Sequence, residues 1–139
     1  MKRTVVLVVL LAGCSGKNDN PAADRKAELG QPIAKLTAVV LFSEYDDNAI
    51  AADGKYLDQT LEVTGTVNVI ESDRIGFAVV GDSDKPSVIC RIEPGNVKEF
   101  ASWQKDRMQS VVGRCRGVQK KPGAWQDKVI ILDRCRPAN

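Results

Sequence analysis

The sequence predicts a mainly β protein, in which a five-stranded Greek-key barrel follows a pair of helices. Two observations lead to this class. Five segments alternate apolar and polar residues or are rich in β-branched residues, which is typical of strands. Helical spacing of apolar residues comes before the first of these segments and again after the third. This is the element order of the OB fold, and a split β-sandwich of similar content is the alternative.

The first residues predict export and lipidation. A basic start precedes an apolar run over 5–11, far shorter than the roughly 20 residues that a membrane-spanning helix needs, so we interpret residues 1–13 as a signal peptide. The run ends in Leu-Ala-Gly-Cys, which resembles the lipobox of bacterial lipoproteins. This resemblance implies cleavage before Cys14 and its acylation with fatty acids such as palmitate. Ser15 at the next position implies sorting to the outer membrane, facing the periplasm.

A tether is expected between this anchor and a single folded domain. Residues 14–31 contain almost no large apolar side chains, so they cannot bury enough surface to offset the entropy of ordering. We expect N-terminal helices over 32–57, packed on the barrel, and the OB barrel over 58–137. The chain without its signal peptide is long enough for one domain with a modest core.

Two helices are expected before the barrel. Pro32 precedes apolar residues at helical spacing, which predicts a first helix that begins at this proline. Asn48 is placed to cap a second short helix that ends near Gly54. Asn48, Asp53 and Tyr56 together could be mistaken for a polar active site. Capping of the helices and docking of the tyrosine ring explain these residues better.

The barrel strands are expected from alternation and from turn residues. The first strand, over 61–69, contains Gly65, at which we expect it to bend. On the third strand Val88, Cys90 and Ile92 share one face. The other strands are expected over 75–80, 111–118 and 128–135, and the helix between the third and fourth strands over 96–110.

The composition argues against an enzyme. The chain contains no histidine, which removes the commonest general base and the commonest zinc ligand. Its paired carboxylates, at Asp46 and Asp47 and again at Asp82 and Asp84, lie where turns are expected. We therefore expect no catalysis, no cofactor and no metal site.

The charge is unevenly distributed along the chain. Residues 14–84 carry 6 basic and 13 acidic side chains, whereas residues 85–139 carry 12 basic and 5 acidic ones. Without the signal peptide the two signs balance, so a strongly basic nucleic-acid-binding protein is not indicated. A basic face remains open, and pairing of opposite charges across one small domain is the simpler interpretation.

Three cysteines remain once Cys14 is acylated, in a compartment that permits disulfides. They can form at most one bridge, and none lies in a Cys-x-x-Cys pair that would indicate a redox or zinc site. Cys115 and Cys135 belong to the last two strands, which form a hairpin, and we favour this pairing. Cys90 with Cys135 is the alternative, because the third and fifth strands of an OB barrel lie side by side.

Several short motifs agree in residue type and spacing with one known family. They are Glu44-Tyr45-x-x-Asn48, Ala52-Asp53-x-x-Tyr56, LEVTGTV, Val88-x-Cys90, Gly113-x-Cys115-x-Gly117 and Leu132-Asp133-Arg134-Cys135. Over about residues 36–136 the chain resembles the bacterial tRNA-anticodon-like OB-fold lipoproteins. The resemblance implies an OB barrel that follows helices and is exported to the envelope. It does not imply tRNA binding, because the family name records a likeness of fold.

An OB barrel binds ligands across its second and third strands, between the loops that join strands one to two and four to five. The candidate ligand-binding residues are therefore Arg74, beside Asp73, and Phe77, Arg91, Lys120, Lys121, Trp125 and Lys128. An aromatic ring on a basic loop can stack on a base or sugar while cations meet phosphates. The loop over 120–127 is longer than in the family, so its function would be particular to this chain. A solvated loop whose Trp125 covers the end of the barrel is the alternative, which the neutral total charge favours.

Two functions follow from this sequence. The first is a lipid-anchored envelope module with a protein-interaction or structural role, whose partners are the membrane, through Cys14, and an envelope protein. The second is a binder of oligonucleotides or anionic oligosaccharides. Gathering of the candidate cations and Trp125 on one side of the barrel would favour the second, and their separation would favour the first.

Overall fold

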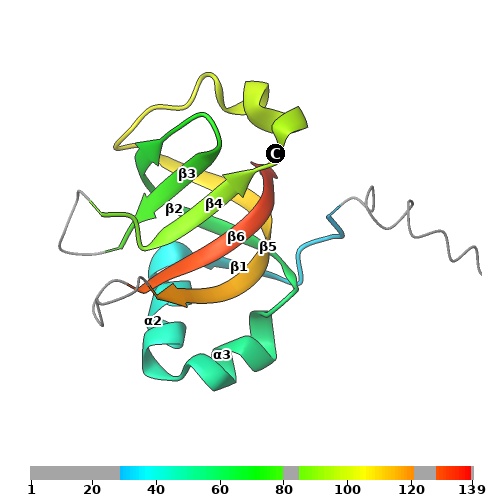
Figure 1. Cartoon of the computed structure of the whole chain (residues 1–139), viewed down its shortest axis with the longest axis vertical. Helices are drawn as coiled ribbons and strands as arrows, with labels where there is room; N and C mark the ends of the chain where they lie inside the picture. Colours follow the sequence, from blue (N-terminus) through cyan, green and yellow to red (C-terminus); the bar gives the residue numbers. More distant parts are fainter. Residues whose placement is uncertain (1–28, 80–84, 121–127, 139) are drawn as a thin grey trace, which may run out of the picture.

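A computed structural model describes residues 29–79, 85–120 and 128–138 (Figure 1). Its elements in chain order are β1 (Ala34–Thr37), α2 (Ala38–Asp47), α3 (Ala49–Tyr56), β2 (Thr60–Ile70), β3 (Arg74–Ala78), β4 (Val88–Ile92), the 3-10 helix η1 (Pro94–Phe100), β5 (Met108–Lys120) and β6 (Lys128–Pro137). Helices α2 and α3 lie at one end of the barrel, and η1 and the chain's C-terminus lie at the other.

Five strands close into a barrel in the order β2-β3-β4-β6-β5, with β2 also paired to β5. Strands β4 and β6 are parallel, and the other barrel pairs are antiparallel. This is the topology of the OB fold, so the expected class is confirmed. The additional strand β1 pairs in parallel with the first half of β2, from Ala34 beside Leu61 to Thr37 beside Thr64.

Strand β2 pairs with β5 through its first half and with β3 through its second half. Its residues alternate between buried and half-buried, and its pairing with β3 shifts by one residue between Val67 and Val69. At Gly65 a Cβ atom would lie 3.0 Å from Ala38 Cβ and 3.0 Å from the ring of Phe77. Glycine is therefore needed where the strand passes between the first turn of α2 and the core.

The core fills the barrel with aliphatic side chains around the ring of Phe77. Burial of this apolar surface is the main favourable contribution to folding. The largest fully buried side chains are those of Phe77, Leu41, Leu61, Ile75, Ile130, Leu132, Val63, Val67, Val88, Val111, Cys90 and Cys115.

The first helix begins later than predicted. Residues 34–37 form β1 instead, and the side chain of Thr37, not Pro32, begins α2 by accepting a hydrogen bond from the Val40 amide at 3.2 Å. The spacing of Ile33 and Leu36 fitted a helix, but pairing of this segment with β2 outweighs that local preference. Ile33 is accordingly 58% exposed.

Asn48 caps the second helix as predicted. Its side-chain oxygen accepts a hydrogen bond from the Ala51 amide at 3.0 Å, although α3 continues past Gly54 to Tyr56. The ring of Tyr45, which is 2% exposed, packs 6.5 Å from that of Tyr56, centroid to centroid. Neither helix, nor any other in the described part of the chain, has the length and apolar character needed to cross a membrane.

The helix expected over 96–110 is shorter and of another type. The 3-10 helix η1 ends at Phe100, whose ring meets that of Trp103 edge to face at 4.8 Å between centroids. Met108 already belongs to β5 and pairs with Thr66. The helical spacing of apolar residues over 96–110 arose because residues of η1 and of β5 both contributed to it.

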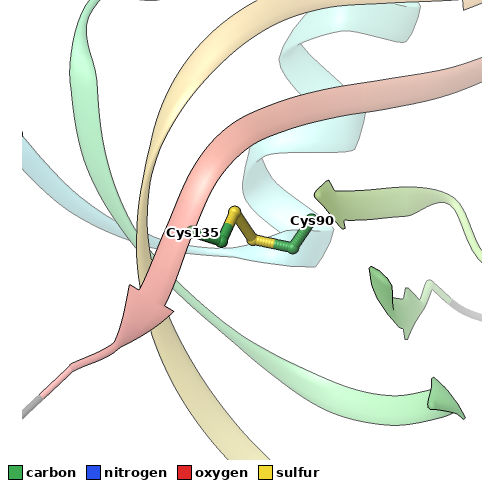
Figure 2. Close-up of a disulfide and its surroundings, with 2 residues drawn as sticks. All are labelled: Cys90 and Cys135. Carbon is green, nitrogen blue, oxygen red and sulfur yellow. A yellow bond between two sulfur atoms is a disulfide. The ribbon is translucent and has the colours of Figure 1, made fainter. Parts of the chain in front are cut away.

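The disulfide joins Cys90 to Cys135, with 5.9 Å between their Cα atoms, so the favoured pairing of Cys115 with Cys135 is wrong (Figure 2). Strands β4 and β6 run side by side, and Ile92 pairs with Cys135 after a shift in register. Cys115 instead pairs with Leu132, away from Cys135, and is a buried free thiol. The alternative pairing through the third and fifth strands is the one found.

Candidate functional site

The outer face of β3 and β4 is where an OB barrel would receive a ligand. Arg74 and Arg91 pair directly across these two strands, and both are exposed. Between them and the other end of the face lie Gly76, paired with Ile89, and then Ala78. This face therefore has two arginines at one end and small or apolar side chains along the rest.

The arginines at this end have acidic neighbours. The Arg74 guanidinium lies 3.0 Å from Asp73 Oδ1 and 3.2 Å from Glu71 Oε2. Its hydrogen bond to Asp73 is the main reason that the pKa of this carboxyl is lowered, and the charge of Arg91 lowers that pKa further. Two positive and two negative groups thus meet at the β2–β3 turn, which leaves little net attraction for a phosphate.

The centre of the face is covered by the chain itself. Gly76 is buried, and a Cβ atom there would lie 2.7 Å from Pro86 Cβ and 2.9 Å from Val69 Cβ. The Ser87 amide donates to the Phe77 carbonyl at 2.9 Å and holds the segment after Pro86 against β3. A base or sugar has no room to stack against the backbone at this point.

Phe77 lies inside the barrel, contrary to the prediction that it contacts a ligand. It is 0% exposed and forms part of the core, because the pleat of β3 directs it inward, opposite to its outward-facing neighbour Gly76. No aromatic side chain lies on the outer face of β3 or β4, whose bounds fall wholly within the described residues.

The candidate lysines lie at the opposite end of the barrel from the arginines. Lys128 pairs with Lys120 where β5 ends and β6 begins, and its ammonium lies 3.1 Å from Asp46 Oδ1 of α2. Because β4 and β6 are parallel with Val88 beside Ile130, Lys128 lies beyond the start of β4, whereas Arg91 is near its end. Lys121 and Trp125 fall outside the described residues. The candidates whose positions are described are separated rather than gathered.

The structure also shows polar contacts that sequence reasoning did not find. The Tyr45 hydroxyl donates to Asp53 Oδ1 at 3.0 Å and lies 3.4 Å from Cys115 Sγ, so α2, α3 and β5 meet at one buried point. Burial and these contacts raise the pKa of Tyr45 well above its usual value, and burial raises that of the Cys115 thiol. Seventy residues separate Tyr45 from Cys115, and no local pattern indicates their contact.

A second group of this kind surrounds Arg116. Its guanidinium contacts Asp58 at 2.7 Å and Asp133 at 2.6 Å, which ties the end of α3 to the β5–β6 hairpin. Nearby, a hydrogen bond to Glu44 raises the pKa of Tyr56 to about 12. These contacts support the structural interpretation of Asp53 and Tyr56. Within the described ranges no cluster of acidic and cysteine side chains is arranged to hold a metal ion.

Comparison with known proteins agrees with this architecture. A solved structure of a putative nucleic acid-binding lipoprotein from Klebsiella pneumoniae subsp. pneumoniae is similar in fold, with a TM-score of 0.57 and 13% sequence identity, over 86% of this chain and 100% of the other. No curated protein matches the chain. The family model tRNA_anti-like matches residues 2–129, nearly the whole length. The chain therefore belongs to the tRNA_anti-like family, as its motifs indicated.

Proposed function

We propose that this protein is a lipid-anchored module of the bacterial envelope whose OB barrel has a protein-interaction or structural role. Acylation of Cys14 would hold it in the outer membrane, and the barrel would face the periplasm. The proposal includes no catalytic activity, because the chain lacks histidine and its polar clusters are explained by helix capping and docking. The Leu-Ala-Gly-Cys segment and the similarity to a lipoprotein support the anchor.

One observation carries the choice of a protein-interaction role over ligand binding on the strands. The face on which an OB barrel takes a base is covered at its centre by Pro86 over Gly76. The arginines at its end already have Glu71 and Asp73 as neighbours. A single strand of nucleic acid needs both stacking platforms and unneutralised cations. This face has no aromatic platform, and of its two arginines only Arg91 makes no ion pair with a described residue.

Labelling and isolation from cells test this proposal. Radioactive palmitate should label the wild-type chain, and Cys14→Ser should lose both the label and signal cleavage. The lipidated protein isolated from crosslinked envelopes should carry a reproducible protein partner, identified by mass spectrometry, that the Cys14→Ser variant does not retain. Equal labelling of both chains would refute the anchor, and isolation of the lipidated protein without any partner would refute the interaction role.

Binding of oligonucleotides or anionic oligosaccharides is the second candidate. It is favoured by the direct pairing of Arg74 with Arg91 and by the description of the Klebsiella lipoprotein as nucleic acid-binding. If it holds, a single strand should bind the protein more weakly as salt rises, because phosphate contacts release counterions. Substitution of Lys120, Lys121 and Trp125 should then reduce this binding. If these substitutions leave the binding unchanged, the loop over 120–127 has no role in binding the strand.

A further inference from the structure

Four elements meet at the end of the barrel opposite α2 and α3, and we name this surface the η1 end. It comprises the ends of β4 and β6 and η1, which lie together in Figure 1, and the connection over 101–107, which runs from η1 across this end of the barrel toward β2. Residues of β6 and η1 are in contact. The connection is fixed to β2 by two backbone hydrogen bonds, from the Asp106 amide to the Val67 carbonyl and from the Val67 amide to the Arg107 carbonyl.

Positive charge without a partner collects at the η1 end. The side chains of Lys98, Lys105, Arg107 and Arg136 make no hydrogen bond or ion pair with any residue that the structure describes. Three lysines in the other part of the molecule have acidic partners: Lys35 meets Glu62, Lys55 meets Glu44 and Lys128 meets Asp46. Four of the basic residues in the second half of the sequence therefore lie at this end without an ion pair, beside the acidic residues Glu93, Glu99 and Asp106.

An aromatic anchor accompanies this charge. Trp103 is partly exposed and is held by the edge-to-face contact with Phe100 and by its amide, which donates to the Phe100 carbonyl at 3.0 Å. Val97, also in this segment, is 36% exposed. Tryptophan and arginine are the residues that most often dominate the binding energy of protein interfaces, particularly where their conformation is already fixed.

We propose that the η1 end is the surface by which this module binds its partner, and that the partner presents an acidic segment with an apolar side chain for Trp103. The inference rests on the protein-interaction role proposed above. A nucleic acid fits less well, because a single strand is bound through successive stacked bases as well as through its phosphates. Only one described ring, that of Trp103, is offered for stacking in this segment.

A defined probe tests the chemistry of this surface. A fluorescent acidic peptide of glutamate, leucine and glycine is titrated against the full mature chain. The controls are a peptide in which lysine replaces each glutamate and an oligothymidylate with the same net charge as the acidic peptide. The acidic peptide should bind, and Lys105→Gln with Arg107→Gln should weaken it by about tenfold. The matched control, Lys35→Gln with Lys55→Gln, removes the same charge from the other part of the molecule and should change binding less than about twofold.

Three results would overturn the inference. The first is that the oligothymidylate binds as tightly as the acidic peptide and that its binding is lost in the same variant. The second is that the two double variants weaken peptide binding equally. The third is that the acidic peptide does not bind. Thermal unfolding of each variant confirms that it is folded.

Crosslinking in cells separates failure of this inference from failure of the proposed function. A photoreactive amino acid is placed at exposed Gln104 of the η1 end or at Ile50 of α3, which is 87% exposed. Crosslinks to an envelope protein from position 104, lost with Lys105→Gln and Arg107→Gln, support the inference. Crosslinks from position 50 alone overturn it and leave the interaction role intact. No crosslink from either position, with no partner isolated from envelopes, contradicts both.

Discussion

Pro86 lies against Gly76 so closely that a Cβ atom at position 76 would stand 2.7 Å from the Cβ of the proline. The contact brings the segment before β4 onto the outer face of β3, where an OB barrel usually meets its ligand. The chain thus uses for its own packing a surface that the fold leaves available in other proteins.

Replacement of Gly76 by alanine should therefore destabilise the protein. The added methyl group must displace Pro86 or Val69, at a cost of about 1 to 3 kcal/mol in the free energy of unfolding. Urea denaturation followed by circular dichroism measures this change. Gly95→Ala is the matched control, because a Cβ there meets nothing within 4 Å. Equal stability of the two variants would show that the face is open.

The disulfide should map to Cys90 and Cys135. Digestion of the non-reduced, alkylated protein should release a peptide that joins these two cysteines, and Cys115 should be alkylated only after unfolding because it is buried. The bridge spans a sequence separation of 45, so its removal in a Cys90→Ser, Cys135→Ser variant should lower the free energy of unfolding by about 4 kcal/mol. A disulfide-linked peptide that contains Cys115 would contradict this connectivity.

Tyr45 should make the protein sensitive to alkaline pH. Its pKa is raised in the folded state, so the stability linked to its proton is complete below the unfolded pKa near 10 and is lost as the pH rises above that value. The loss is at most about 1.4 kcal/mol per pH unit for one such group. The raised pKa values of Cys115 and Tyr56 act in the same direction.

A Tyr45→Phe variant isolates this contribution. It should be less stable than wild type at neutral pH by about 1 kcal/mol, because the hydroxyl contacts are lost. Between about pH 10 and pH 11 its stability should fall less steeply than that of wild type. Parallel stability curves for the two proteins across this range would show that Tyr45 does not titrate as its burial requires.

Removal of the Asn48 side chain should destabilise α3. Asn48→Ala leaves the Ala51 amide without its acceptor, which should cost about 1 kcal/mol of unfolding free energy, whereas Asn48→Asp keeps an acceptor at the same place and should cost less. Chemical denaturation measures both variants. An alanine variant as stable as the aspartate variant would remove the capping role of this residue.

The sequence predicted the barrel because its signals are local. Alternation along β2 and β4, and the capping residue Asn48, depend on near neighbours in the chain and are found where expected. The position of Ile33 depends on its pairing with β2, some 27 residues away. The spacing of nearby apolar residues carries no information about this distant contact. In the same way, the choice between Cys90 and Cys115 depended on a register shift in β6 that has no signature in the sequence.

The candidate site was harder to predict than the fold. Mapping from OB topology located Arg74 and Arg91 correctly on one face, since strand order alone places them there. It wrongly grouped Phe77 with these arginines, although Phe77 is three residues from Arg74 and the alternation of a strand directs it to the opposite face. It also could not foresee Pro86 over Gly76, which depends on where the loop before β4 returns to the sheet.

Binding of a fluorescent single-stranded oligonucleotide at low salt tests the central claim most directly, namely that the β3–β4 face is not a nucleic-acid site. The mature wild-type chain is compared with an Arg74→Glu, Arg91→Glu variant. The two proteins should give the same weak or undetectable binding, because Glu71 and Asp73 already offset these arginines and Pro86 covers the centre of the face. Saturable binding by wild type that falls steeply with salt and is abolished in the variant would contradict the account.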